Sequence, residues 1–202
     1  MKILIGSNNK KKIGEITAIF ANAFGDKVRI LLPNDVFDIA PDPEETGATL
    51  EENALIKSEC FFKLSGIACV ADDTGLEIDA LDGAPGVLSA RFAGDHGNDQ
   101  ANRSRVLELL NGIPESARTA RFRSVFCFTD GINTFTVDGA IEGRIIDHER
   151  GTGGFGYDSI FVPNGYYETF AELSADVKNS ISHRSRAISA LVAKLKEMDL
   201  VK

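Results

Sequence analysis

Two adjacent carboxylates, Asp72 and Asp73, directly follow the short apolar run Ile67 to Ala71. Such a run is typical of a buried strand, where an ionised carboxylate is costly unless it is paired, hydrated or bound to a metal. Paired carboxylates suit Mg²⁺, which takes few protein ligands and adds substrate phosphates. A tight acidic turn over Asp72 to Gly75 is the structural alternative, because Asp-Thr-Gly does form turns. The suitability of paired carboxylates for Mg²⁺ favours the functional interpretation.

A lysine-rich segment, Ser7 to Lys12 (SNNKKK), follows the first strand-like run, Lys2 to Gly6. Apolar residues then recur at helical spacing from Ile13 to Phe24. In a strand, loop and helix of this kind, N–H groups at the helix start can meet phosphate oxygens, and the lysines would add positive charge. A solvated lysine run on a surface turn is the alternative.

The segment Gly151 to Asp158 (GTGGFGYD) combines four glycines with two aromatic residues. Glycines allow positive φ and a close approach to a ligand, while Phe155 and Tyr157 offer flat faces on which a nucleobase could stack. The alternative is a glycine-rich turn into a strand over Ser159 to Val162, with the aromatics packed inward.

Basic residues precede the last helix, which we expect over Ala187 to Met198. The segment before it, KNSISHRSR, holds Lys178, His183 and Arg184. Cations at a helix N-terminus oppose the helix dipole unless an anionic or carbonyl-bearing ligand is present. The alternative is a capped, basic helix start.

An acidic, proline-containing connection leads into a helix predicted from about Thr49 to Leu64. Thr49 and Glu52 stand at capping-box spacing, so capping is the expected role of Glu52. Glu44 and Glu45 lie just ahead of the cap, are free of that duty and are the better ligand candidates. Asn53 and Lys57 lie one turn apart, so both can project from one face toward a common site.

The remaining segments supply a scaffold. Strands are predicted over residues 28–32 and 76–81, a structural helix over 99–111, and two long strands over 120–128 and 134–146 joined by a hairpin at Asp130-Gly131. The hairpin makes the sheet mixed rather than purely parallel.

Composition limits the class of protein. The chain has 202 residues, 26% charged and 43% hydrophobic, with a formal net charge of -8, which argues against coating nucleic acid or an anionic membrane. We find no apolar run long enough to span a bilayer and no signal-peptide pattern, so a cytoplasmic location is expected. The three cysteines lie in apolar runs and are interpreted as buried thiols.

These motifs occur together in one order along nearly the whole chain. The sequence resembles the inosine triphosphate pyrophosphatase family through SNNKKK, EETGATLEENA, ADDTGLEIDALDGAPG, SARF, GTGGFGYD and SHR. The resemblance implies an α/β fold with a long mixed central sheet flanked by helices, in two lobes with a nucleotide cleft between them. It also implies one pyrophosphatase domain over residues 1–202 and a homodimer.

By the same resemblance, the protein would hydrolyse ITP, dITP or XTP to the monophosphate and pyrophosphate with Mg²⁺. Asp73 would be the general base and, with Glu45, a magnesium ligand. The substrate-binding residues would be Ser7, Asn8, Asn9, Lys10, Lys11, Lys12, Lys57, Thr74, Phe155, Gly156, Tyr157, Asp158, Lys178, His183 and Arg184.

Two rival interpretations stay open at this point. A Maf-like enzyme shares the architecture but acts on other nucleotides, and GTGGFGYD and SHR argue against it. A nucleotide-binding regulator without catalysis would avoid carboxylates such as Glu45, Asp72 and Asp73, because without a metal they repel its ligand.

Overall fold

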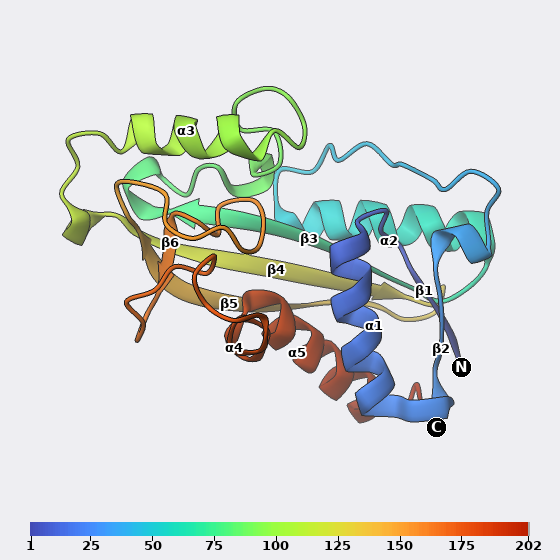
Figure 1. Ribbon diagram of the computed structural model, residues 1–202. Helices are drawn as coiled ribbons and strands as arrows, with labels where there is room; N and C mark the ends of the chain where they lie inside the picture. Colours follow the sequence, from blue (N-terminus) through green and yellow to red (C-terminus); the bar gives the residue numbers. More distant parts are fainter. Residues whose placement is uncertain (202) are drawn as a thin grey trace. The chain divides into compact units, whose positions relative to one another are not determined.

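Strand pairing builds one six-stranded mixed sheet in the order β2-β1-β3-β4-β5-β6, shown in Figure 1. The structure is a computed structural model that describes residues 1–201. Strand β1 pairs in parallel with β2 and β3, and β5 pairs antiparallel with β6. The strands are β1 (Lys2–Ile5), β2 (Arg29–Leu31), β3 (Cys69–Ile78), β4 (Thr119–Thr129), β5 (Thr134–Ile145) and β6 (Phe161–Pro163).

The helices flank this sheet. The α-helices are α1 (Lys10–Phe24), α2 (Leu50–Ser65), α3 (Asp99–Leu109), α4 (Ala175–Ile181) and α5 (His183–Glu197). Short 3-10 helices are η1 (Gly25–Lys27), η2 (Pro33–Asp35), η3 (Asp79–Leu81), η4 (Gly86–Leu88) and η5 (Glu115–Ala117). Helices on a mixed sheet make this an α/β fold, as predicted. Among the helices of residues 1–201, none is both long and apolar enough to cross a membrane.

The chain divides into two compact units whose segments alternate along the sequence. Unit 1 comprises Met1–Asp73, Ser124–Gly139 and Ser185–Lys202, and unit 2 comprises Thr74–Arg123 and Ala140–Arg184. Strands β3, β4 and β5 therefore contribute residues to both units.

The core of unit 1 follows the alternation of side chains along its strands. Ile3 and Ile5 pack with buried residues of α1 and α5, including Ile16 and Leu191. Leu4, between the two isoleucines, packs instead with residues that include Phe61 of α2. Helices α1 and α5 thus cover one face of these strands and α2 covers the other (Figure 1).

Unit 2 has its own core. It is built on Leu76, Phe122 and Phe161 from β3, β4 and β6, together with Val106 of α3. The Phe122 and Phe161 rings meet edge to face with centroids 4.7 Å apart, a favourable aromatic geometry.

Several predicted boundaries were wrong. Residues 72–75 form no turn, because β3 continues through them to Ile78 and unites two predicted strands. The three lysines of the predicted phosphate loop lie in the first turn of α1, which begins at Lys10. The last helix begins at His183 rather than Ala187, and Lys178 lies in the separate helix α4. Strand β6 begins at Phe161 rather than Ser159.

Other predictions were confirmed by local hydrogen bonds. Thr49 caps α2 through its hydroxyl, which accepts from the Glu52 N–H at 3.2 Å, and the Glu52 carboxylate accepts from the Ala48 N–H at 2.6 Å. In the predicted hairpin, the Asp130 carboxylate accepts from the N–H groups of Ile132 and Asn133. Of the three cysteines predicted to be buried, Cys69 and Cys127 are, whereas Cys60 is only partly buried.

Candidate active site

In unit 1, two carboxylates converge on the ammonium of Lys57. Its Nζ donates to Glu45 Oε1 at 2.7 Å and to Asp73 Oδ1 at 3.0 Å. One turn earlier on α2, Asn53 Nδ2 donates to Asp73 Oδ2 at 3.2 Å. The spacing of Asn53 and Lys57 predicted a shared target, and the structure confirms it: that target is Asp73.

The chain before α2 is tied closely to this cluster, which explains how a loop residue, Glu45, reaches it. The Gly47 N–H donates to Asn53 Oδ1 at 2.8 Å. A Cβ at Gly47 would lie only 2.6 Å from the Glu52 side chain and 2.9 Å from the Asn53 backbone nitrogen. Glycine is therefore required where the connection meets the helix.

The electrostatic balance of the cluster differs for its two central groups. Burial lowers the pKa of Lys57, but the negative charges of Asp73, Asp72 and Glu45 raise it by more than burial lowers it. The pKa of Lys57 therefore lies above its ordinary value. Burial raises the pKa of Asp73 and Glu45 adds to this, while Lys57 and Lys12 act against it. The net pKa of Asp73 stays above its usual range. Lys57 is thus firmly charged, and Asp73 is a stronger base than an exposed carboxylate.

The neighbouring carboxylate, Asp72, lies on the opposite face of β3 from Asp73 and pairs with a residue of α1. Its Oδ2 lies 2.8 Å from Lys12 Nζ, and the Asp72 side chain is fully buried. Consecutive strand residues face opposite sides, so Asp72 pairs with Lys12 and Asp73 with Lys57, while the charges of Asp72 and Lys12 still act on Lys57 and Asp73. Asp72 therefore has a partner of its own in Lys12.

The predicted phosphate segment begins with polar residues that cap α1. Asn9 Oδ1 accepts from the Lys12 N–H at 3.3 Å, and Ser7 Oγ accepts from the Asn9 N–H at 3.2 Å. Asn8 Nδ2 donates to the Pro41 carbonyl at 3.0 Å. The backbone of Lys11 lies in α1, whereas its side chain is outside the part that the structure describes.

The carboxylate oxygens of unit 1 are suited to bind a divalent cation whose remaining ligands are substrate phosphates. Glu45 and Asp73 each place one oxygen within hydrogen-bonding distance of the same ammonium, so those oxygens lie close together. Within residues 1–201, the structure holds no cluster of three or more His, Cys, Asp or Glu that could bind a metal alone. Two carboxylates match the preference of Mg²⁺ for few protein ligands, to which substrate phosphates are added.

In unit 2, the glycine-rich segment folds around the carboxylate of Asp158. Asp158 Oδ2 accepts from the Phe155 N–H at 2.8 Å and from Lys178 Nζ. Gly154 has a φ of +72°, and a Cβ there would lie 2.0 Å from the same carboxylate oxygen. The sequence thus needs glycine at this position both for the backbone conformation and for space.

The two aromatic residues of this segment have different environments. Tyr157 is buried in the unit 2 core and donates its hydroxyl to the Ser89 carbonyl at 2.8 Å. Phe155 is half-buried, with Lys178 Nζ 5.1 Å and the Arg184 guanidinium 5.8 Å from its ring centroid. Of the two rings, Phe155 is the one placed for contact with a ligand.

His183 and Arg184, the first residues of α5, are both buried. The His183 ring stacks on Phe122 with centroids 4.9 Å apart and an angle of 18° between the planes. Phe155, Lys178 and Arg184 therefore lie close together in unit 2. His183, which precedes Arg184 in the sequence, packs against the unit 2 core. Thr74, half-buried in β3, is the first residue of unit 2.

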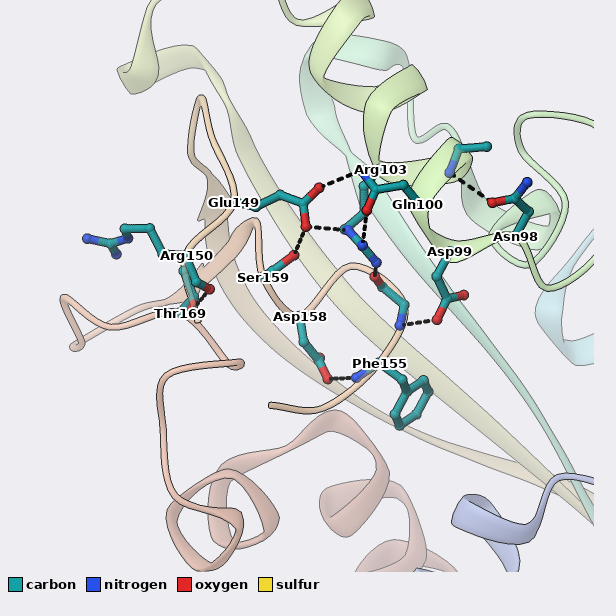
Figure 2. A network of polar contacts seen from close by, with 12 residues as sticks. Asn98, Asp99, Gln100, Arg103, Glu149, Arg150, Phe155, Asp158, Ser159 and Thr169 are labelled. Atoms are coloured by element: carbon teal, nitrogen blue, oxygen red, sulfur yellow. Dashed lines mark hydrogen bonds and ion pairs between the residues drawn. The ribbon is translucent and has the colours of Figure 1, made fainter. Parts of the chain in front are cut away.

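Sequence reasoning missed the contribution of α3, which was interpreted as structural. Asp99 and Arg103 from this helix bind both backbone groups of Gly156 (Figure 2). The sequence did contain a signal: two opposite charges four residues apart, near the start of a helix, which places them on the same helical face. That pattern alone is common and does not identify the loop it contacts.

Comparisons with known proteins show the family to which this chain belongs. The Ham1 family model matches residues 3–194. The chain belongs to the Ham1 family. Its resemblance to nucleotide pyrophosphatases, inferred from the motifs, is thereby confirmed, and the Ham1 assignment covers both groups of residues described above.

Relatives of this Ham1 chain match it over nearly their whole length. The dITP/XTP pyrophosphatase of Corynebacterium efficiens is 44% identical, over 98% of this chain and 99% of the relative. The solved Ham1 protein of Staphylococcus aureus is 38% identical with a TM-score of 0.87, over 98% of this chain and all of the other. A solved dITP/XTP pyrophosphatase from Mycobacterium abscessus is 44% identical with a TM-score of 0.79, over 95% and 97%.

Proposed function

We propose that this protein hydrolyses the deaminated purine nucleoside triphosphates ITP, dITP and XTP to their monophosphates and pyrophosphate. The observation that carries the proposal is Lys57, partly buried between the carboxylates of Glu45 and Asp73. A ligand pocket for phosphates alone would not hold two carboxylates, which repel phosphate unless a cation is added. The relatives named dITP/XTP pyrophosphatases support the choice of substrate.

The residues of unit 1 bind the triphosphate in this proposal. Lys57 and Lys12 supply positive charge to phosphate oxygens, and Ser7 to Lys12 form the phosphate-binding segment. Glu45 and Asp73 would hold Mg²⁺, which when bound neutralises phosphate charge and makes the bond between the α- and β-phosphates easier to break. Asp73, with its raised pKa, accepts a proton from the attacking water.

The residues of unit 2 select the base. The ring of Phe155 stacks on the purine, and Lys178, His183 and Arg184 supply donors to the 6-keto oxygen. Adenine carries an amino group at that position, so its binding would leave those donors unpaired. The proposal therefore predicts discrimination against ATP through lost hydrogen bonds rather than through size.

The wider setting is part of the same proposal. We expect a single pyrophosphatase domain over residues 1–202 that acts in the cytoplasm as a homodimer. Support comes from the family resemblance. Sedimentation analysis of the purified protein would test the dimer directly.

The deciding experiment measures pyrophosphate release from ITP, XTP, GTP and ATP side by side, with and without Mg²⁺. We expect metal-dependent release from ITP and XTP, with GTP and ATP far slower. Absence of release from all four, with ITP binding retained in a titration, would contradict the hydrolase and leave a nucleotide-binding protein.

A further inference from the structure

The backbone of Gly156 is held on both sides by α3. Its N–H donates to Asp99 Oδ2 at 2.8 Å, and its carbonyl accepts from Arg103 Nη1 at 2.8 Å. Asp99 and Arg103 are one helical turn apart, so they project from the same face of α3 toward one peptide segment (Figure 2). Gly156 has a φ of +60°, a conformation that glycine takes at little cost and that these two contacts retain.

Arg103 is itself fixed by its other hydrogen bonds. Its Nε donates to Glu149 Oε2 at 2.8 Å, and its Nη2 donates to Gln100 Oε1 at 2.7 Å. Glu149 also accepts from Gln100 Nε2 at 3.0 Å and from Ser159 Oγ at 2.9 Å. Each nitrogen of the guanidinium is thus engaged, and the donor to Gly156 is held in one orientation.

The charge of Glu149 is stable in this network. Burial raises its pKa, but the hydrogen bonds from Ser159, Gln100 and Arg103 outweigh burial, so the pKa of Glu149 lies below its usual value. The carboxylate therefore stays ionised opposite Arg103, and the pair remains charge-assisted at neutral pH.

The loop also commits further backbone N–H groups to the protein. The Gly153 N–H donates to the Ala171 carbonyl, the Phe155 N–H to Asp158, and the Asp158 N–H to the Phe155 carbonyl. At these positions, and at Gly156, the loop has no N–H to offer a purine. What it presents to a ligand is chiefly the ring of Phe155, whose place depends on how the adjoining peptide of Gly156 is held.

We propose that Asp99 and Arg103 are positioning residues for base selection, which set the placement of the Phe155 ring by holding both backbone groups of Gly156. The inference rests on the proposed function. It assigns to α3 a role in substrate recognition without contact with the substrate. Weakening either side chain should impair binding of the purine and leave the phosphate-binding residues of unit 1 unaffected.

The test compares Arg103→Gln with Arg105→Gln. Arg105 lies on the same helix, is exposed and pairs only with Glu108 among the contacts recorded for the described residues. For Arg103→Gln we expect KM for ITP to rise about tenfold, because a tenfold change corresponds to the loss of roughly one charge-assisted hydrogen bond. We expect kcat to stay within about twofold of the wild-type value. Inorganic tripolyphosphate, which lacks a base, should inhibit both variants and the wild type with the same inhibition constant. Arg105→Gln should match the wild type throughout.

Asp99 gives a second route that does not depend on how well Arg103→Gln folds. Asp99→Asn keeps an acceptor oxygen for the Gly156 N–H and should remain close to the wild type, whereas Asp99→Ala should show the raised KM. Hydrogen exchange at the Gly156 amide should be faster in Asp99→Ala and Arg103→Gln, and unchanged in Arg105→Gln.

An unchanged KM for ITP in both Arg103→Gln and Asp99→Ala, or an equal weakening of ITP and tripolyphosphate, would overturn the inference. Failure of the proposed function has a different signature: the wild-type protein itself would then release no pyrophosphate from ITP.

Discussion

Some charged side chains of unit 2 have a use that those of the unit 1 cluster do not have. In unit 1, Lys57 pairs with both Glu45 and Asp73, and these charged groups are themselves proposed to meet metal and phosphate. In unit 2, Arg103 and Asp158 hold the backbone of a glycine-rich loop. The comparison teaches that charges for phosphate chemistry can be placed largely by strand and helix, whereas an aromatic ring on a loop must be positioned by side chains from elsewhere.

The largest expected effect is on catalysis by unit 1. Asp73→Asn keeps the shape of the side chain and its place beside Asn53, but it removes the proposed base and a negative charge. We expect turnover of ITP to fall about 1,000-fold with nucleotide binding retained, since general-base catalysis contributes on this scale.

Steady-state kinetics and ITP titration of Asp73→Asn check this expectation. Asp72→Asn is the matched control, because Asp72 is the adjacent residue and pairs with Lys12 on the other face of the strand. It should lose far less turnover than Asp73→Asn. A near-normal rate for Asp73→Asn would remove the general-base assignment.

A second expected effect concerns stability. Lys57→Met deletes the cation between Glu45 and Asp73 and leaves a buried carboxylate uncompensated. The free energy of unfolding should fall by about 3 kcal/mol, as when one partner of a buried ion pair is removed. Urea denaturation followed by circular dichroism measures the change.

Lys63→Met on the same helix is the control for that experiment. Lys63 is 69% exposed and pairs with Glu59 one turn away, a surface ion pair of little energetic weight. It should unfold at the same urea concentration as the wild type. Equal stability of the Lys57 and Lys63 variants would contradict the view that the unit 1 cluster is an interdependent buried group.

The smallest expected effect is on base selection by unit 2. Arg184 lies near the ring of Phe155 and is proposed to donate to the 6-keto oxygen of the purine. Arg184→Ala should reduce the preference for ITP over ATP about tenfold, measured as the ratio of kcat/KM values, because one charge-assisted hydrogen bond is lost. Arg186→Ala, an exposed position two residues along α5, should preserve the ratio. An unchanged ratio in Arg184→Ala would place base reading elsewhere.

The sequence predicted best where the cause is local. Helical spacing placed Asn53 and Lys57 on one face, Thr49 and Glu52 marked the start of α2, and Asp130-Gly131 marked the hairpin. Each of these depends on residues within a few positions, so composition and spacing carry the information.

Prediction failed where distant residues decide the outcome. Asp72 to Gly75 could form a turn by its composition, yet it lies within β3, where Lys12 and Lys57 pair with its two carboxylates. A Cβ at Gly75 would lie 2.6 Å from the Gly86 carbonyl oxygen, a close approach that the sequence does not announce. Likewise, the contact of Arg103 with Gly156 joins residues 53 positions apart.

The most direct test of this division of labour sets Asp73→Asn and Arg184→Ala beside the wild type in one series of ITP titrations and single-turnover time courses with Mg²⁺. The account predicts near-normal ITP affinity with a slow chemical step for Asp73→Asn. For Arg184→Ala it predicts a weakened affinity for ITP and a near-normal rate of the chemical step at saturating ITP. The reverse pattern, with Asp73→Asn impaired only in binding and Arg184→Ala only in the chemical step, would contradict it.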